Sequence, residues 1–228
     1  MEIEVADDPA AAAALAAVWI ARRARDAVRR RGAFTLAVSG GSTPSLMFDE
    51  LTQLDVPWPQ TTIFQVDERI AADGSSDRNA TQLEEHLGSA LGAATVRLMP
   101  VTAADERRAA ARYAARREGV RLDVVHLGMG DDGHTASWPP GDPVGDVRGD
   151  GAPLVTIVGP FNGLRRMTLT PPVVNAARAR LVLVTGAAKA PVVERWLLRD
   201  GELPIERVRR ADTRLVLDRD AASRLPAT

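Results

Sequence analysis

His134 is the side chain best suited to acid–base chemistry in this sequence. It lies in residues 128–135 (GMGDDGHT), where three glycines among eight residues predict a constrained, exposed turn after a buried strand. An imidazole changes protonation near neutral pH, so His134 could act as a general base. Asp132, two residues earlier, could orient the imidazole or hold a substrate hydroxyl. A histidine that only caps a loop is the alternative interpretation.

A second turn, residues 39–44 (SGGSTP), could bind an anion. Gly40 and Gly41 would let the backbone approach a ligand closely, and Ser42 and Thr43 would add their hydroxyl groups. Thr43 followed by proline also predicts the start of a helix, whose positive end would face the anion. An ordinary tight turn with a helix cap is the competing interpretation.

Several basic side chains are candidates for holding a phosphate or carboxylate. Asp67 and Arg69 belong to a DER sequence after a predicted strand, where Arg69 could bind an anion or neutralise its acidic neighbours. Lys189 is the only lysine in the chain and lies in the first turn of a predicted helix. A cation there is unfavourable unless an anion binds beside it. Of the pair Arg165 and Arg166, we expect one to point into the site and the other to solvent.

The remaining composition excludes several classes of function. The chain has no cysteine, so thiolate nucleophiles, disulfides and cysteine metal sites are absent. His86 falls in a predicted helix and His126 in a predicted strand, and we interpret both as structural. Without a third ligand beside His134, we expect no metal site. A formal net charge of −1 provides no general attraction to nucleic acid or to a membrane surface.

The apolar N-terminal run, residues 10–20, is interpreted as a surface helix. Asp7 and Asp8 precede it, where a signal peptide would carry positive charge, and arginines follow it. It is also shorter than the roughly 20 apolar residues that cross a bilayer. We therefore expect a cytoplasmic protein.

The sequence predicts an α/β fold in a single domain spanning residues 1–228. Of its residues 45% are hydrophobic, and no linker or internal repeat divides it. Strands are predicted at 34–38, 62–66, 96–99, 122–127, 154–158, 167–169, 181–185 and 213–217. Helices are predicted at 9–31 (capped by Asp8), 44–54, 78–87, 102–118 and 187–199. Residues 141–151, rich in Gly, Pro and Asp, are predicted to be an irregular, mobile loop.

Strands alternating with helices indicate a mainly parallel sheet with helices on both faces. Ligands of such folds bind beyond the carboxyl ends of the strands. Residues 39–43, 67–69, 128–134 and 186–189 all follow predicted strands, so we expect them to meet at one edge of the sheet. Trp138, just past His134, could form a wall of that pocket.

With these motifs in this order, the sequence resembles the 6-phosphogluconolactonase family, relatives of the glucosamine-6-phosphate deaminases. The resemblance covers nearly the whole chain through SGGSTP, VDER (66–69), GMGDDGHTAS (128–137), RMTLTPPVVNAAR (166–178) and the 186–189 turn. It implies a Rossmann-related isomerase/lactonase-like fold, no cofactor, and hydrolysis of 6-phospho-D-glucono-1,5-lactone in the oxidative pentose phosphate pathway. His134 would be the catalytic base, while Ser42, Thr43, Arg69 and Lys189 would hold the substrate, largely through its phosphate.

Two departures from the family pattern concern the pocket wall. The serine–asparagine pair that follows DER in the family is matched only in part, by Arg78 and Asn79. A phenylalanine–proline end to the histidine motif is replaced by Trp138-Pro139-Pro140.

A deaminase and a non-catalytic sugar-phosphate sensor are the rival functions. Deaminases carry a glutamate five residues beyond the motif histidine, where this chain has Pro139. The missing carboxylate favours the lactonase, because lactone hydrolysis can proceed with one base and a held water. The sensor would have the same anion site without turnover. The sequence does not determine the oligomeric state, although a monomer is favoured.

Overall fold

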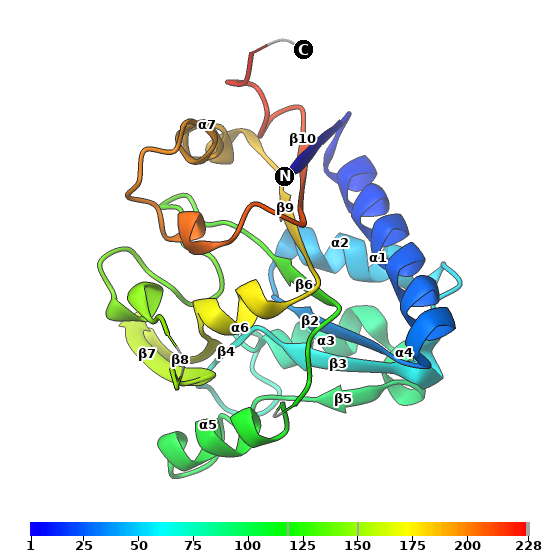
Figure 1. The fold of residues 1–228 in the computed structure, drawn as a ribbon, viewed down its shortest axis with the longest axis vertical. Coiled ribbons are helices and arrows are strands. Elements are labelled where there is room, and N and C mark those ends of the chain that lie inside the picture. The colour runs from blue at the N-terminus through cyan, green and yellow to red at the C-terminus, as the bar shows by residue number, and fades with distance from the viewer. Residues whose placement is uncertain (118, 150, 227–228) are drawn as a thin grey trace.

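A seven-stranded parallel sheet forms the centre of the computed structural model, which describes residues 1–117, 119–149 and 151–226 (Figure 1). The strand order is β1-β10-β9-β6-β2-β3-β5. In that order the strands are Glu2–Ala6, Thr213–Asp218, Ala179–Val184, Val124–Leu127, Phe34–Val38, Thr61–Gln65 and Thr95–Arg97. The α/β class and the mainly parallel sheet are therefore confirmed.

Helices cover both faces of this sheet, as predicted (Figure 1). One face carries α1 (Pro9–Arg31), α2 (Ser42–Thr52), α3 (Asn79–Leu87) and α4 (Ser89–Ala93), and the other carries α5 (Glu106–Ala115), α6 (Pro171–Ala176) and α7 (Ala190–Leu198). Strand residues alternate between two cores: in β9, Leu181 packs under α1 and α2 while Val182 packs on the opposite face. Because the sheet is buried on both faces, side chains on both sides of its central strands are apolar, and these strands appear in the sequence as continuous apolar runs.

The N-terminal helix begins and ends where its sequence signals indicate. The Asp8 carboxylate accepts a hydrogen bond from the N–H of Ala11 at 2.8 Å, Pro9 occupies the first turn, and Gly32 ends the helix with φ 77°. Alanines form its buried face. Among the described residues, no helix is both long and apolar enough to cross a membrane.

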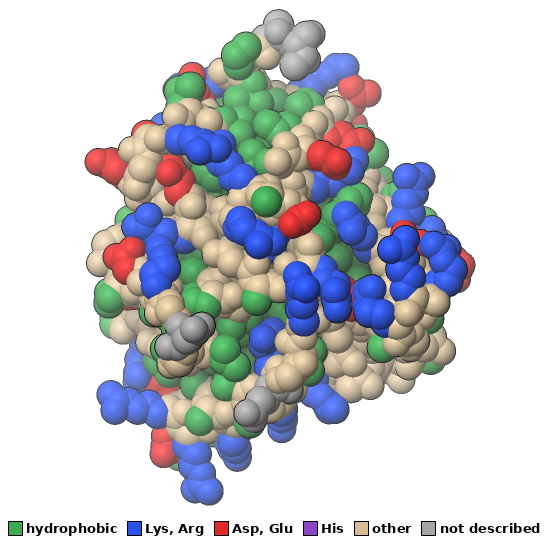
Figure 2. All heavy atoms as spheres, in the orientation of Figure 1, with side chains coloured by type: hydrophobic (Ala, Val, Ile, Leu, Met, Phe, Trp, Pro, Cys, Tyr) green, Lys and Arg blue, Asp and Glu red, His purple; other side chains and the backbone are tan. Residues whose placement is uncertain are grey.

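Arginines gather on the face of the molecule where α1 lies (Figure 2). Three of them, Arg29 to Arg31, occupy its last turn, where positive charge complements the negative end of the helix. Asp123, just before β6, pairs with Arg31 at 2.6 Å and with Arg178 at 3.1 Å. These arginines therefore stabilise the amino edge of the sheet, opposite the edge at which ligands bind in such folds.

A second, antiparallel sheet of three strands was not anticipated. Its order is β4 (Asp67–Arg69), β8 (Leu164–Leu169) and β7 (Val155–Phe161). β4 consists of only three residues, all polar, so it lacks the alternation of apolar and polar residues that predicts a strand. Arg165 and Arg166, expected to precede a strand, lie within β8. The edge strand β1 was also missed, because only its pairing with β10 makes it a strand.

Several element boundaries differ from the predictions. Gly41, rather than Thr43, is the N-cap of α2. The helix predicted at 102–118 is shorter, Glu106–Ala115, because the Asp105 carboxylate caps it; residue 118 lies outside the described residues. A 3-10 turn, η3 (Ala187–Lys189), precedes α7.

The segment 141–151 is more regular than predicted. It contains the 3-10 turn η2 (Pro143–Asp146), capped by the Asp142 carboxylate, and Val144 of this turn is buried. Residue 150 lies outside the described residues. The expectation that this segment does not pack regularly is therefore wrong for residues 143–146, where one apolar side chain anchors the turn.

His126 of β6 is a buried histidine without a hydrogen-bond partner for either ring nitrogen among the described residues. Its ring lies edge-on to Phe48, with the centroids 6.4 Å apart. Burial disfavours the charged imidazolium and lowers the pKa of His126 to about 3. The side chain is therefore neutral and structural, in agreement with the interpretation from the sequence.

The depressed pKa of His126 predicts a pH-dependent loss of stability. In the unfolded chain the imidazole takes a proton below about pH 6.5, whereas in the folded chain it does so only near pH 3. Between these values the unfolded state binds more protons, so the free energy of unfolding falls as pH falls, by up to about 1.4 kcal/mol per pH unit. Urea denaturation of the wild type and of His126→Leu between pH 4.5 and 7 measures this slope.

The His126→Leu variant should lose this part of the pH dependence. Replacing an unpartnered buried polar ring by an apolar side chain of similar size should also leave stability at pH 7 equal or higher. His86→Gln is the matched control, since His86 lies on the surface beside Asp49 at 2.8 Å. Identical slopes for wild type and His126→Leu would contradict the prediction.

Candidate active site

A pocket of about 230 Å³ opens at the carboxyl edge of the large sheet. The pocket lies at the point where the order of strand addition changes. After β2 the chain adds β3 and β5 on one side of it, and then adds β6 on the other side. Ligands of doubly wound sheets bind at such a switch point. All four polar segments picked out from the sequence contribute to the lining: residues 39–43, Asp67 with Arg69, residues 128–130 with His134, and Lys189.

His134 lines this pocket, and Asp132 holds its ring. The Nδ1 atom of His134 lies 2.5 Å from Oδ1 of Asp132, and the same oxygen accepts the backbone N–H of His134 at 3.0 Å. An ionised carboxylate can only accept, so Nδ1 carries the proton, and in the neutral ring the lone pair is then on Nε2. Partial burial raises the pKa of Asp132, but the two hydrogen bonds from His134 outweigh it and the net shift is downward.

Backbone contacts fix the turn that carries His134. The N–H of Gly130 donates to the carbonyl of His134 at 2.8 Å, and the hydroxyl of Thr135 donates to the carbonyl of Gly128 at 2.8 Å. Gly133 has φ +81°, and an added Cβ there would lie 2.7 Å from Leu203. A Cβ on Gly130 would lie 2.0 Å from Nδ1 of His134. The glycines are therefore needed for the turn and for the place of the imidazole.

The start of α2 forms another wall of the pocket. The N–H of Gly41 donates to Oε1 of Gln82 at 2.8 Å, and the hydroxyls of Thr43 and Thr185 are hydrogen-bonded at 2.8 Å. The first N–H groups of a helix have no partner within it, so this turn offers donors and a positive dipole end to an anion. Gly40 lets the side chain of Asn79 approach, because a Cβ on it would lie 2.2 Å from Oδ1 of Asn79.

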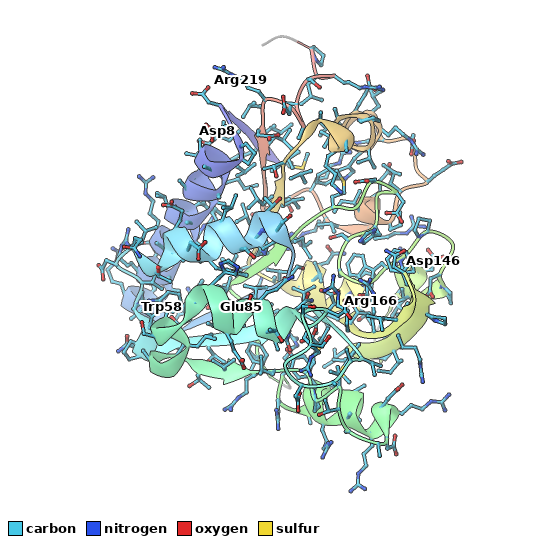
Figure 3. All side chains as sticks on the ribbon, turned by 180° about the vertical axis from the view of Figure 1, so that it is seen from behind. Asp8, Trp58, Glu85, Asp146, Arg166 and Arg219 are labelled. Carbon is cyan, nitrogen blue, oxygen red and sulfur yellow. The ribbon has the colours of Figure 1, made fainter. Side chains whose placement is uncertain are left out.

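Arg69 and Arg166 lie side by side on neighbouring strands of the small sheet. They are directly paired in the register of β4 and β8, and both line the pocket. Figure 3 shows Arg166 between α3 and the hairpin of β7 and β8. Burial, and then the charge of Arg69, lower the pKa of Arg166. Two cations in this arrangement repel each other, and a bound anion would relieve the repulsion.

Both arginines retain donors for a ligand. Arg69 gives one N–H to the carbonyl of Asp77 at 2.6 Å, but the Nε atoms of Arg69 and Arg166 are buried without a partner among the described residues. Arg165, by contrast, is exposed and pairs with Glu106 at 2.6 Å. Of the two adjacent arginines, Arg166 thus lines the pocket, whereas Arg165 points to solvent.

Asp67 is buried beneath these arginines. Its Oδ2 accepts the hydroxyl of Ser137 at 2.7 Å, and its carbonyl accepts the side-chain amide of Asn79 at 2.9 Å. Burial raises the pKa of Asp67, and the hydrogen bond from Ser137 and the charge of Arg69 offset this only in part. Asp67 therefore joins β4, α3 and the histidine motif into one framework.

Lys189 reaches the pocket from η3, between β9 and α7. Its ammonium group pairs with the carboxylate of Asp131, the residue before Asp132. Asp131 is well exposed, so the pair can open when a stronger anion arrives.

Trp138 does not form a wall of the pocket. It is fully buried, and its indole N–H donates to the carbonyl of Leu169 at 2.8 Å, so it anchors the histidine motif to β8 instead. Within the described part of the chain, no group of three or more His, Asp or Glu side chains is arranged to hold a metal ion.

Some residues of the site were not singled out from the sequence. Thr185 follows β9 and Gln82 lies in α3, and neither belongs to a glycine-rich motif. Phe161 packs on His134 from the β7–β8 hairpin. The dipeptide Asn162-Gly163 between apolar residues is a hairpin signal that would have placed Phe161 beside a tight turn.

An imidazole held by a carboxylate in a pocket with basic side chains, at the carboxyl edge of a parallel sheet, is an arrangement that enzymes use for acid–base chemistry. The family model described as "Glucosamine-6-phosphate isomerases/6-phosphogluconolactonase" matches residues 7–217, and the chain belongs to this family.

Similar proteins include 6-phosphogluconolactonases. The 6-phosphogluconolactonase of Nostoc sp. is 33% identical over 202 residues, 84% of this chain and 82% of that protein. The GDH/6PGL endoplasmic bifunctional protein of Oryctolagus cuniculus is 37% identical over 180 residues, 73% of this chain but only 22% of the relative. This chain thus spans about a fifth of that larger protein.

Solved structures share the fold over nearly all of the chain. The 6-phosphogluconolactonase from Trypanosoma brucei has a TM-score of 0.87 and 26% identity, and covers 99% of this chain and 98% of its own. That from Shewanella baltica has a TM-score of 0.85 and 28% identity, with 96% and 97% covered. A monomeric glucosamine-6-phosphate deaminase has a TM-score of 0.81 but 16% identity, which shows a common fold alone.

Proposed function

We propose that this protein hydrolyses 6-phospho-D-glucono-1,5-lactone to 6-phosphogluconate, with His134 as the general base. The observation that carries the proposal is the imidazole of His134 in the anion pocket, with Nδ1 held by Asp132 and Nε2 free to accept a proton. Similarity to the 6-phosphogluconolactonases supports the choice of substrate.

The chemistry follows from this geometry. Nε2 of His134 takes a proton from water, the oxygen of which attacks the lactone carbonyl carbon. The resulting oxyanion is stabilised by a nearby cation or by loop N–H groups. The C1–O5 bond then breaks, and the imidazolium returns its proton to the departing ring oxygen. Asp132 stabilises the charged imidazolium during this cycle.

The phosphate of the substrate would be held by the basic residues and the α2 turn. Arg69, Arg166 and Lys189 supply positive charge, and Gly40 to Thr43 supply donors at the helix start. Fixing the phosphate orients the lactone carbonyl against the water held by His134, which contributes to the rate. We further propose that the protein acts as a single domain in the cytoplasm, consistent with a sequence that contains no cysteine.

Acid release from freshly prepared 6-phosphogluconolactone tests the proposed function. The purified protein should accelerate release well beyond the spontaneous ring opening, and it should release no ammonia from glucosamine 6-phosphate. Binding of 6-phosphogluconate without any acceleration would instead support a sugar-phosphate sensor. Ammonia release would support the deaminase.

Lys189→Gln is expected to weaken recognition of the phosphate. Loss of one charge-assisted hydrogen bond should raise KM for the phosphorylated lactone by about 10- to 100-fold. KM for unphosphorylated gluconolactone should change little. Asp131→Asn is the matched control: it removes the partner of Lys189 but keeps the ammonium, so KM should stay equal or fall. Equal losses for both lactones in Lys189→Gln would exclude Lys189 from the phosphate site.

A further inference from the structure

Phe161 occupies a fixed position at the end of the β7–β8 hairpin. Its backbone pairs with that of Leu164, and only Asn162 and Gly163 lie between them. Both turn residues have positive φ, 50° and 79°, as a type I′ turn requires. The place of the Phe161 ring is therefore set by the hairpin rather than by a flexible loop.

The ring of Phe161 contacts the imidazole and one of the arginines of the site. It lies edge-to-face with His134, with the ring centroids 5.0 Å apart and the planes at 79°. The guanidinium carbon of Arg166 lies 4.9 Å from the centroid of the same ring. Both distances are in the range of favourable aromatic and cation–π contacts. One apolar side chain thus joins the candidate base to the candidate phosphate site.

His134 needs a second contact to fix its orientation. Asp132 bonds only Nδ1, which determines the tautomer and restrains rotation of the side chain about Cα–Cβ and Cβ–Cγ at one edge of the ring. The surrounding turn is rich in glycine, and the side chain of His134 retains a quarter of its exposure. A flat apolar ring against the imidazole restricts this rotation without competing for the lone pair of Nε2.

The guanidinium of Arg166 also needs a contact that fixes its orientation. Its cross-strand neighbour is Arg69, which repels it, and its Nε has no hydrogen-bond partner among the described residues. The face of Phe161 attracts the guanidinium and keeps it over the pocket before any anion binds.

We propose that Phe161 is a positioning residue, which holds the imidazole of His134 and the guanidinium of Arg166 in a fixed relation to each other. The proposal rests on the proposed function for its kinetic consequence. It couples two parts of one reaction: the base that activates water and the cation that receives the phosphate. The side chain requirement is aromatic rather than merely apolar.

Phe161→Leu tests the proposal, because leucine keeps an apolar side chain but removes the ring. We expect kcat for the phosphorylated lactone to fall about 3- to 10-fold. The affinity for inorganic phosphate, measured by calorimetry, should weaken about 2- to 5-fold. Phe161→Tyr should restore both quantities to near the wild-type values, since tyrosine supplies the same ring.

Leu164→Ala is the matched control. Leu164 pairs with Phe161 across the hairpin, so the variant shortens the neighbouring side chain while the backbone pairing and the Asn162-Gly163 turn that place Phe161 are kept. It should lower the melting temperature at least as much as Phe161→Leu, yet leave kcat and phosphate affinity at the wild-type values. If Leu164→Ala lost activity like Phe161→Leu, or if tyrosine failed to restore it, Phe161 would have only a structural role.

The proposed function and this inference can fail separately. A wild-type protein that does not hydrolyse the lactone would overturn the function, whereas phosphate calorimetry would still report on Arg166. The NMR chemical shifts of the His134 ring protons provide a second readout without substrate, because the ring current of Phe161 changes them. Unchanged His134 shifts and unchanged phosphate affinity in Phe161→Leu would overturn the inference.

Discussion

Replacing His134 with alanine is expected to lower kcat for the phosphorylated lactone by about 10²- to 10⁴-fold. The imidazole is the only group of the pocket that combines a carboxylate-held Nδ1 with a free Nε2 among the described residues. Without it, water must attack the carbonyl with no general base. Acid release from fresh lactone, corrected for spontaneous opening, measures the loss.

The same variant should still bind the product. His134 is uncharged when it acts as a base, and the variant keeps Arg69, Arg166 and Lys189, which form the proposed phosphate site. The dissociation constant of 6-phosphogluconate, measured by calorimetry, should therefore stay within a few-fold of the wild-type value. Wild-type kcat in His134→Ala would remove the imidazole from its proposed role.

Asp132→Asn distinguishes orientation from base strength. The asparagine can still accept from Nδ1–H if its amide oxygen faces the ring, but it no longer stabilises the imidazolium. We expect a loss of kcat that is smaller than that of His134→Ala, with unchanged product binding. A loss equal to that of His134→Ala would mean that the tautomer, and not only the charge, depends on the carboxylate.

The large sheet and the meeting of four turns could be predicted from the sequence because both depend on local signals. Apolar strands such as residues 34–38 end at glycines, and the carboxyl ends of parallel strands necessarily share one edge. The pairing of His134 with Asp132 was anticipated for the same reason, since two residues of one turn are close in any conformation of it.

The small sheet and its contribution to the site could not be predicted in this way. Arg69 and Arg166 are 97 positions apart, and only the antiparallel pairing of β4 with β8 brings them face to face. Trp138 was misplaced because its sequence neighbours line the pocket, whereas the chain direction after Thr135 turns its indole into the core. Local motifs thus identified the chemical groups, while tertiary pairing decided which of them meet.

Gly130→Ala is expected to abolish most activity while sparing the fold. An added Cβ would lie 2.0 Å from Nδ1 and 2.1 Å from Cε1 of His134, and 2.7 Å from Oδ1 of Asp132. Real Cβ atoms do not approach other atoms so closely, so the imidazole and its carboxylate must both leave their positions. A displacement on the order of 1 Å can reduce the rate about 10²-fold, and we expect at least this loss in kcat.

Gly92→Ala, in α4, is the control for that experiment, because it adds the same methyl group at a glycine that does not line the pocket. A Cβ at Gly92 would meet no atom within 4 Å, and neither Gly92 nor Gly130 has the positive φ that strains an alanine. Both variants should therefore melt near the wild-type temperature and bind 6-phosphogluconate, yet only Gly130→Ala should lose turnover. Equal activity of the two variants would mean that catalysis does not depend on the imidazole held at this position, since the methyl group at residue 130 cannot coexist with it.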